Sequence, residues 1–188
     1  MTSGWNSRRL TILAVGTALV MTGCDSSGDD AAPSGVPSPS PTIAPDVPTG
    51  YDPCTDIPQS VLDSENLRGK DKQDSNASGG VKWRGCGWVQ TDGYAPAITT
   101  TNITVDMVRD KKFADTREYA INGRRAISTR QVEEHPDAVC TINVEMKGGS
   151  LEFFLSNPPS NRKTGQLDTC ALAKTLAEKV VATMPSSA

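Results

Sequence analysis

The stretch CTINVEMKGGSLEFFL, residues Cys140–Leu155, gives the clearest indication of the fold. On each side of the glycine pair Gly148-Gly149, apolar residues alternate with polar ones, which is typical of strands with one buried face. The alternating apolar residues are Cys140, Ile142, Val144 and Met146 before the turn, and Leu151, Phe153 and Leu155 after it. The stretch therefore predicts an antiparallel hairpin whose apolar face packs in a core.

A helix is predicted directly downstream, between Asp168 and Pro185. Asp168 can cap its first turn, and Pro185 cannot continue it. Its apolar residues recur at the spacing of a single helical face: Leu172, Ala173, Leu176, Ala177, Val180 and Val181. We expect this face to pack on one face of the sheet.

A second hairpin is predicted around Asn122-Gly123, a dipeptide that tolerates the positive φ angles of a tight type I′ turn. It would join strands at Arg117–Ile121 and Arg124–Arg130. The other predicted elements are a short helix that begins at Pro58, an exposed loop at Lys70–Gly80, and strands at Val81–Gln90 and Ala97–Met107 joined around Asp92-Gly93. The predicted fold class is α+β: an antiparallel sheet of about five strands, with an N-terminal helix and a C-terminal helix packed on it.

The first residues of the chain predict export and membrane anchoring. Arg8 and Arg9 precede an apolar run, Leu10–Met21, that is shorter than the roughly 20 residues needed to span a membrane. Small residues then stand directly before Cys24, which predicts a signal peptide at 1–23 that is cleaved in front of a lipidated cysteine. Acyl chains on Cys24 would hold the protein at the extracytoplasmic face of the cell membrane. The alternative is an ordinary signal peptide cleaved at another position.

The segment that follows the cysteine predicts a tether. Residues 24–50 are rich in Ser, Pro and Asp, and they include the alternating run Pro37–Pro41. Such a composition has little to bury and predicts disorder. Residues 51–188 then form a single globular domain, near the commonest domain size.

Four cysteines remain in that domain: Cys54, Cys86, Cys140 and Cys170. An exported domain with an even number of cysteines is expected to form two disulfides, and three pairings exist. We prefer Cys54–Cys86 with Cys140–Cys170, while Cys54–Cys170 with Cys86–Cys140 stays open as the leading rival. A zinc site is not expected, because no two cysteines have C-x-x-C spacing.

Several short motifs along the chain together resemble one protein family. They are Cys24 with its acidic Ser/Pro tether, Asp52-Pro53-Cys54, Cys86-Gly87-Trp88, Asn122-Gly123-Arg124-Arg125-Ala126, Cys140 at the start of a strand, and Asp168-Thr169-Cys170-Ala171-Leu172-Ala173 at the start of the last helix. In their order and spacing they resemble the actinobacterial lipoproteins grouped as DUF 3558, a domain of unknown function. The resemblance implies an actinobacterial cell-envelope lipoprotein and supports the disulfide framework, but it brings no catalytic residue.

Four side chains are candidates for contact with a ligand or partner. Trp83 and Trp88 lie on opposite faces of their predicted strand, so one is expected in the core and the other is available for binding. Arg124 and Arg125 also point to opposite faces, and each could form an ion pair or hold an anionic envelope component.

The titratable residues give little support for catalysis. His135 is the only histidine, and it lies in an acidic segment that is expected to be an exposed loop. The S-x-x-K and K-T-G patterns overlap in Ser160–Gly165, although in penicillin-recognising enzymes they belong to separate parts of a larger fold. We therefore expect no enzymatic activity, no metal and no cofactor, and the scattered basic residues do not predict nucleic-acid binding.

The expected function is that of a binding or interaction module anchored in the cell envelope. Its partner would be an envelope protein or a glycan, and an exposed aromatic patch that includes Trp83 or Tyr94 would favour this role. The alternative is a carrier or sensor of a small or lipidic ligand, which needs an apolar cavity between sheet and helices. An envelope enzyme ranks last, because it needs a cluster of titratable groups in a cleft.

Overall fold

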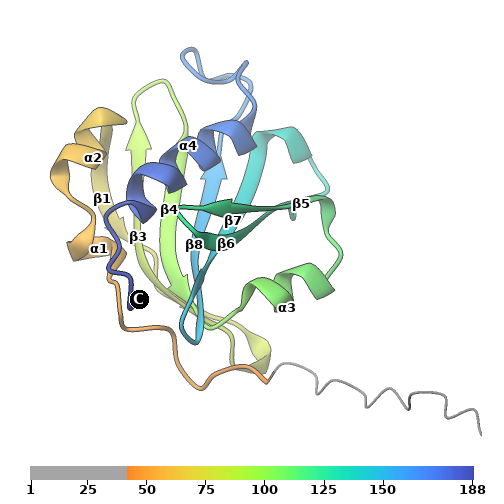
Figure 1. The fold of residues 1–188 in the computed structure, drawn as a ribbon. Helices are drawn as coiled ribbons and strands as arrows, with labels where there is room; N and C mark the ends of the chain where they lie inside the picture. Colours follow the sequence, from red (N-terminus) through yellow and green to blue (C-terminus); the bar gives the residue numbers. More distant parts are fainter. Residues whose placement is uncertain (1–41) are drawn as a thin grey trace, which may run out of the picture. The chain divides into compact units, whose positions relative to one another are not determined.

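The computed structural model describes residues 42–188 (Figure 1), so Cys24 and the predicted signal peptide lie outside the described residues. The helices are α1 (Pro53–Asp56), α2 (Gln59–Ser64), α3 (Val105–Asp110) and α4 (Thr169–Val181), with short 3-10 turns at η1 (Ser78–Gly80) and η2 (Pro136–Ala138). The strands are β1 (Leu67–Lys72), β2 (Ser75–Asn76), β3 (Lys82–Gln90), β4 (Ala95–Thr101), β5 (Ala114–Ile121), β6 (Arg124–Arg130), β7 (Val139–Met146) and β8 (Gly149–Ser156).

All the strands belong to one antiparallel sheet of eight strands. Seven of them follow the order β1-β3-β4-β8-β7-β6-β5, and β2 pairs with β3 at the edge. The α+β class is confirmed, but the expectation of about five strands is wrong. The strands that the sequence did not indicate are β1 and β2, whose polar residues show no apolar alternation.

The hairpin of β7 and β8 lies in the middle of the sheet, as its sequence predicts. Ile142 pairs with Phe153, and neither side chain has any exposed surface. The hairpin turns at Gly148, whose φ of 88° favours glycine. The apolar alternation therefore marks the face that is packed against the C-terminal helix.

That helix, α4, covers one side of the sheet, which we call the α4 face. Its first turn is capped by Asp168, whose carboxylate accepts a hydrogen bond of 2.7 Å from the Ala171 backbone N–H. Its buried apolar residues are Ala173, Leu176, Ala177, Val180 and Val181. They pack against β7 and β8 (Figure 1), so the predicted C-terminal helix on the sheet is confirmed.

The opposite side of the sheet, which we call the α3 face, carries a small separate core. Val105 and Val108 of α3 pack on Ile127 of β6. This helix corrects the predicted strand at Ala97–Met107, because the chain leaves the sheet after Thr101. Thr104 then starts the helix, since its hydroxyl accepts a hydrogen bond of 3.2 Å from the Met107 backbone N–H.

The N-terminal part of the domain also differs from the prediction. Two short helices, α1 and α2, replace the single helix, and Pro58 is the N-cap of α2 rather than its first residue. The predicted loop at Lys70–Gly80 contains the end of β1, all of β2 and the turn η1. A register shift around Gly69, where φ is 70°, bends β1 at the sheet edge.

The turn between β5 and β6 has the expected chemistry. Asn122 and Gly123 both have positive φ angles, 47° and 80°, as a type I′ turn requires. The pairing of Ile121 with Arg124 closes the two-residue turn.

Two disulfides tie helices to the sheet. Cys54–Cys86 joins α1 to β3, and Cys140–Cys170 joins β7 to α4. This is the preferred pairing, and the rival pairing is absent. In the chain-entropy description, loops of 32 and 30 positions correspond to about 3–4 kcal/mol of stabilisation each.

The sequence predicts that the domain begins at Tyr51, but residues 42–50 also contact the domain. These nine residues contain no helix or strand. The fully buried amide of Asn102 donates a hydrogen bond of 2.8 Å to the Ala44 carbonyl. The Lys82 ammonium donates one of 2.8 Å to the Pro45 carbonyl. These bonds hold the segment beside the start of β3.

Candidate functional site

The α3 face of the sheet is polar and nevertheless buried. This face is formed by the strand residues that alternate with the apolar residues of the α4 face. Strand pairing places Thr99 of β4, Glu152 of β8 and Asn143 of β7 in one row. The buried polar residues of this face are Thr99, Thr101, Thr129, Thr141, Asn143 and Ser150. Buried polar side chains are costly unless they are hydrogen-bonded, so this face is a natural place to look for a site.

A cavity of about 330 Å³ lies between α3 and this face, and we call it the α3 cavity. Its apolar walls are Ile43, Val81, Ile103, Met107, Val108 and Phe113, and its other lining residues are Trp83, Lys111, Gln131 and Glu152. The volume is at the lower end of the range of about 300–1,000 Å³ that is usual for ligand pockets. A mostly apolar wall with a few polar groups is also the usual composition of such pockets.

A second, more open hollow of about 220 Å³ adjoins the α3 cavity. The two share Trp83 and Glu152, and the hollow continues along the sheet to Phe154. Phe154 is 38% exposed and is one of three large apolar side chains among residues 42–188 that are exposed. Trp83 and Glu152 therefore lie where the mostly apolar α3 cavity meets a more open surface that carries Phe154.

Glu152 is the distinctive residue of the site. The Asn143 amide donates a hydrogen bond of 3.1 Å to its carboxylate and another of 3.0 Å to the Ser150 hydroxyl. Burial raises the pKa of the Glu152 carboxyl, and hydrogen bonding from Asn143 and the Trp83 indole opposes this only in part. No basic side chain among residues 42–188 forms an ion pair with Glu152.

The network around Glu152 extends to α3 and leaves two oxygen atoms without a partner. The Ser150 hydroxyl donates a hydrogen bond of 2.7 Å to the Ile103 carbonyl, which fixes the chain as it leaves the sheet for α3. Within residues 42–188, the side-chain oxygens of Asn143 and Thr141 are buried and have no hydrogen-bond partner. Buried polar atoms without a partner are rare in folded proteins.

The structure separates the two tryptophans as their parity predicts. Trp88 is 4% exposed and belongs to the core on the α4 face, whereas Trp83 is only partly buried on the α3 face. Tyr94 is also part of the core, and its hydroxyl donates a hydrogen bond of 2.6 Å to Glu65. Trp83 is therefore the aromatic residue, of the three considered, that a ligand can reach most easily.

The two arginines of β6 have structural partners. Arg124 donates hydrogen bonds of 2.6 Å to the Pro185 and Ala188 carbonyls at the end of the chain. Arg125 forms ion pairs with Asp106 of α3, at 2.5 Å, and with Glu145 of β7, at 3.3 Å. Its guanidinium and that of Arg109 lower the pKa of Asp106. Arg125 therefore helps to hold α3 against the sheet.

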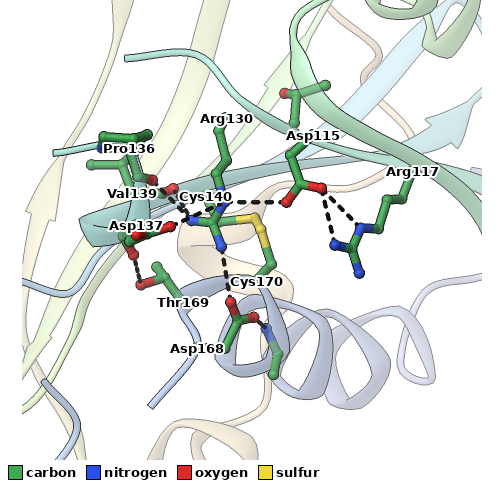
Figure 2. The surroundings of a disulfide bond; sticks show 12 residues. Asp115, Arg117, Arg130, Pro136, Asp137, Val139, Cys140, Asp168, Thr169 and Cys170 are labelled. Atoms are coloured by element: carbon green, nitrogen blue, oxygen red, sulfur yellow. Dashed lines mark hydrogen bonds and ion pairs between the residues drawn. A yellow bond between two sulfur atoms is a disulfide. The ribbon is translucent and has the colours of Figure 1, made fainter. Parts of the chain in front are cut away.

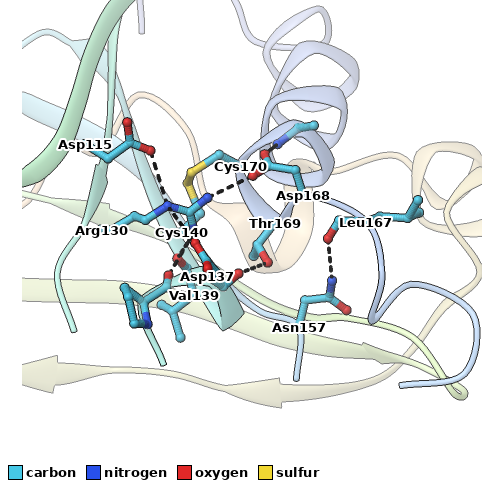
Figure 3. Close-up of polar contacts among 12 residues, drawn as sticks. Asp115, Arg130, Asp137, Val139, Cys140, Asn157, Leu167, Asp168, Thr169 and Cys170 are labelled. Atoms are coloured by element: carbon cyan, nitrogen blue, oxygen red, sulfur yellow. Dashed lines mark hydrogen bonds and ion pairs between the residues drawn. A yellow bond between two sulfur atoms is a disulfide. The ribbon is translucent and has the colours of Figure 1, made fainter. Parts of the chain in front are cut away.

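A further arginine, Arg130, was not singled out by the sequence. Figure 2 shows its guanidinium beside the Cys140–Cys170 disulfide, where it reaches Asp115 and Asp168 together with two backbone carbonyls. Figure 3 shows that Asn157, in the loop that leads to α4, bonds the Leu167 carbonyl close by. These contacts join the end of β6 to the start of α4, which indicates a structural role.

A larger hollow, of about 550 Å³, lies elsewhere, against α1, α2 and β1. Its lining includes Cys54, Trp88 and the exposed Lys70. It lacks a partly buried carboxylate, and it is open on the side of the exposed β1 strand. The α3 cavity is therefore the stronger candidate for a ligand site.

The other residues considered from the sequence are dispersed. His135 lies on an exposed loop with a left-handed φ of 55°, away from the α3 cavity lining. In the described part of the chain, no three His, Cys, Asp or Glu side chains are arranged to hold a metal ion. None of the helices within residues 42–188 is long and apolar enough to cross a membrane.

Comparison with known proteins places the chain in a family. Residues 19–183 match the family model DUF3558, which is described as a protein of unknown function. No curated protein and no solved structure matches the chain. Because the family match covers most of the 188 residues, including all four disulfide cysteines, the chain belongs to the DUF3558 family.

Proposed function

We propose that the chain is a lipoprotein of the actinobacterial cell envelope, anchored through Cys24 to the extracytoplasmic face of the membrane, and that its domain binds a small ligand. The anchor rests on the sequence around Cys24, where a basic start, a short apolar run and small residues precede the cysteine. Two disulfides in the domain fit an oxidising compartment.

The observation that carries the binding role is the α3 cavity with Glu152 in its lining. An apolar cavity between sheet and helix is what a carrier or sensor of a small ligand requires. Polar groups that converge on one point of an apolar wall give such a ligand its orientation. Glu152, Trp83 and Gln131 supply those groups here.

Binding fits the site better than catalysis does. Glu152 has an amide and an indole as neighbours, and among residues 42–188 no second carboxylate, histidine, serine or cysteine lines the α3 cavity, where the other charged group is the exposed Lys111. General acid–base chemistry needs a partner group within hydrogen-bond reach of the reacting atom. Within the described residues, His135 and Lys163 lie on exposed segments away from the cavity lining.

A second candidate function is contact with an envelope protein or a glycan on the open part of the α3 face. Phe154 and Val89 are among the few large apolar side chains of residues 42–188 that are exposed, and both line a shallow hollow together with Ala97. Exposed apolar surface of this kind is typical of interaction sites. This surface and the α3 cavity are continuous, so one ligand could touch both.

The test is native mass spectrometry of the full chain, gently released from its own envelope. The denatured mass should include the acyl groups on Cys24, and the native mass should exceed it by that of a bound small molecule. Val81→Phe, which fills the α3 cavity, should abolish the additional mass. Leu167→Phe adds an aromatic ring at an exposed position outside the cavity lining and should retain it.

The outcomes separate the two parts of the proposal. A chain without acyl groups contradicts the anchor. A chain whose bound species survives Val81→Phe contradicts the α3 cavity as the site, and a bound protein or glycan in place of a small molecule favours the second candidate.

A further inference from the structure

Within residues 42–188, the carboxylate in the lining of the α3 cavity has no ion-pair partner, and this points to the chemistry of the ligand. Among residues 42–188, Glu152 is the only acidic residue that lines the cavity, and the exposed Lys111 is the only basic one. No ion pair joins the two, and Glu152 has no basic partner anywhere in residues 42–188. Removing a carboxylate from water without a counter-ion is costly in free energy. A ligand that brings a positive charge to Glu152 would therefore bind with the most favourable free energy.

The Asn143 amide and the Trp83 indole donate to the Glu152 carboxylate, which can accept about four hydrogen bonds in all. The Asn143 amide N–H groups are already engaged with Glu152 and Ser150, while its buried carbonyl oxygen has no partner in the described chain. The Glu152 carboxylate is itself an acceptor. Since Glu152 lines the cavity and Asn143 does not, the ligand group that fits Glu152 is a hydrogen-bond donor.

The aromatic residues favour the same group. Trp83 and Phe113 line the cavity together with Glu152. The face of an aromatic ring attracts a cation, and Trp does so most strongly. The aliphatic residues of the wall, such as Ile103 and Val108, would cover the apolar remainder of the ligand.

We infer that the α3 cavity binds a small apolar molecule that carries a protonated amine, with the ammonium group placed against Glu152 between Trp83 and Phe113. This inference rests on the proposed function and adds the chemical class of the ligand. It distinguishes the site from one for neutral sugars, because the aliphatic wall offers few partners for hydroxyl groups. It also distinguishes it from one for anions, because Glu152 would repel them.

The test uses three probes with one skeleton and different head groups: 2-phenylethylamine, 2-phenylethanol and phenylacetate. Titration calorimetry at pH 7.5 would measure their affinities for the full chain in a nonionic detergent. The amine should bind about tenfold or more tightly than the alcohol, as expected for a charge-assisted hydrogen bond, and phenylacetate should bind most weakly. Val81→Phe corrects for uptake of the probes by detergent.

Two variants test the role of Glu152. Glu152→Gln keeps the shape and removes the charge, so the amine and the alcohol should then bind within about threefold of each other. Glu178→Gln removes a carboxylate from α4 on the other side of the sheet and should keep the preference for the amine. Lys111→Met removes the other charge of the cavity and should strengthen amine binding or leave it unchanged.

A pH series on the unmodified chain gives a second readout that does not depend on the folding of a variant. The amine probe stays protonated well above pH 8, as aliphatic amines do. Protonation of Glu152 competes with it, so amine affinity should fall as the pH drops through the raised pKa of Glu152, by at most about tenfold per pH unit. Alcohol affinity should not fall in this way.

The inference is overturned if the alcohol binds as tightly as the amine, if phenylacetate binds most tightly, or if none of the probes binds at millimolar concentration. It is also overturned if Glu152→Gln keeps the preference for the amine. A neutral or acidic molecule found in the native mass spectrum, and lost in Val81→Phe, would leave the proposed function in place while refuting the amine.

Discussion

Replacing Arg130 with methionine should lower the free energy of unfolding by about 2–3 kcal/mol. The Arg130 side chain is 8% exposed. Its guanidinium donates hydrogen bonds to the carboxylates of Asp168, at 2.8 Å, and Asp115, at 3.3 Å, and to the carbonyls of Pro136, at 2.8 Å, and Val139, at 3.1 Å. Methionine keeps most of the apolar stem and removes every donor.

The size of this loss depends on which groups lose a hydrogen-bond partner when the Arg130 guanidinium is removed. Breaking a buried ion pair costs about 3–5 kcal/mol when one charge stays buried without a partner. Here the buried charge itself is removed, and Asp168 is 57% exposed, so water can solvate its carboxylate. The loss is then that of several hydrogen bonds, about 1 kcal/mol each, with some recovered by water. For a chain of 188 residues, this corresponds to a fall in Tm of about 4–12 °C.

The assay is urea unfolding of the full chain with both disulfides intact, followed by tryptophan fluorescence. Arg117→Met is the matched control, because Arg117 also pairs with Asp115, at 3.0 Å, but its side chain is 73% exposed. This control should lose no more than about 0.5 kcal/mol, as exposed ion pairs usually do. Equal losses in the two variants, within about 0.5 kcal/mol, would refute the argument that burial makes the Arg130 contacts strong.

Three other substitutions test the surroundings of the α3 cavity. Because burial raises the pKa of Glu152 above its ordinary value of 4.5, the folded protein binds that proton more tightly than the unfolded chain does. The free energy of unfolding of the unmodified protein, relative to that of Glu152→Gln, should therefore fall as the pH rises from 4.5 through the raised pKa of Glu152. The fall should be at most about 1.4 kcal/mol per pH unit. Urea titrations that give the two proteins parallel pH profiles would contradict this. Asn102→Ala should lower the free energy of unfolding by about 2 kcal/mol, because the fully buried Asn102 amide donates hydrogen bonds to the carbonyls of Ala44 and Gly80. Backbone amide hydrogen exchange directly after Ala44 should also become faster. An unchanged exchange rate would mean that other contacts hold residues 42–50. Gly149→Ala should lower the free energy of unfolding by about 1–3 kcal/mol, because the new Cβ would lie 2.0 Å from the Thr101 carbonyl oxygen. Thermal unfolding measures this loss, and an unchanged Tm would mean that β4 moves aside freely.

The elements that the sequence predicted correctly are those specified by local chemistry. The β7–β8 hairpin follows from strict alternation, and α4 follows from a capping aspartate and an apolar helical face. The Asn122-Gly123 turn depends on two residues alone. In each case the local preference and the tertiary packing agree, so the sequence was sufficient.

The elements that were missed depend on distant partners. Ile103, Thr104 and Val105 have the β-branched character of a strand, yet the chain turns into α3 there. The Ser150 hydroxyl, 47 positions away, binds the Ile103 carbonyl and helps to end the strand. Similarly, β1 consists mostly of exposed polar residues, and only its pairing with β3 makes it a strand.

The candidate site was predicted in part. Trp83 was named because a second tryptophan of opposite parity was expected in the core. The sequence does not indicate Glu152 as a site residue, although the alternation in β8 shows on which face of the sheet it lies. A polar residue on the face opposite the apolar alternation is ordinarily left to solvent, and nothing local indicates that α3 and Trp83 enclose it.

That enclosure explains why the α3 face differs from the α4 face. On the α4 face, apolar helix residues meet apolar strand residues, and the result is a close-packed core. On the α3 face, a short helix packs on Ile127 through Val105 and Val108, and the Arg125–Asp106 ion pair and the Ser150–Ile103 bond hold its margins over polar strand residues. Polar contacts at the margins support α3 without filling the space beneath it. A sheet face that keeps a carboxyl partly buried under an incompletely packed helix gives up stability there, and a ligand that neutralises the carboxyl while filling the space would recover it.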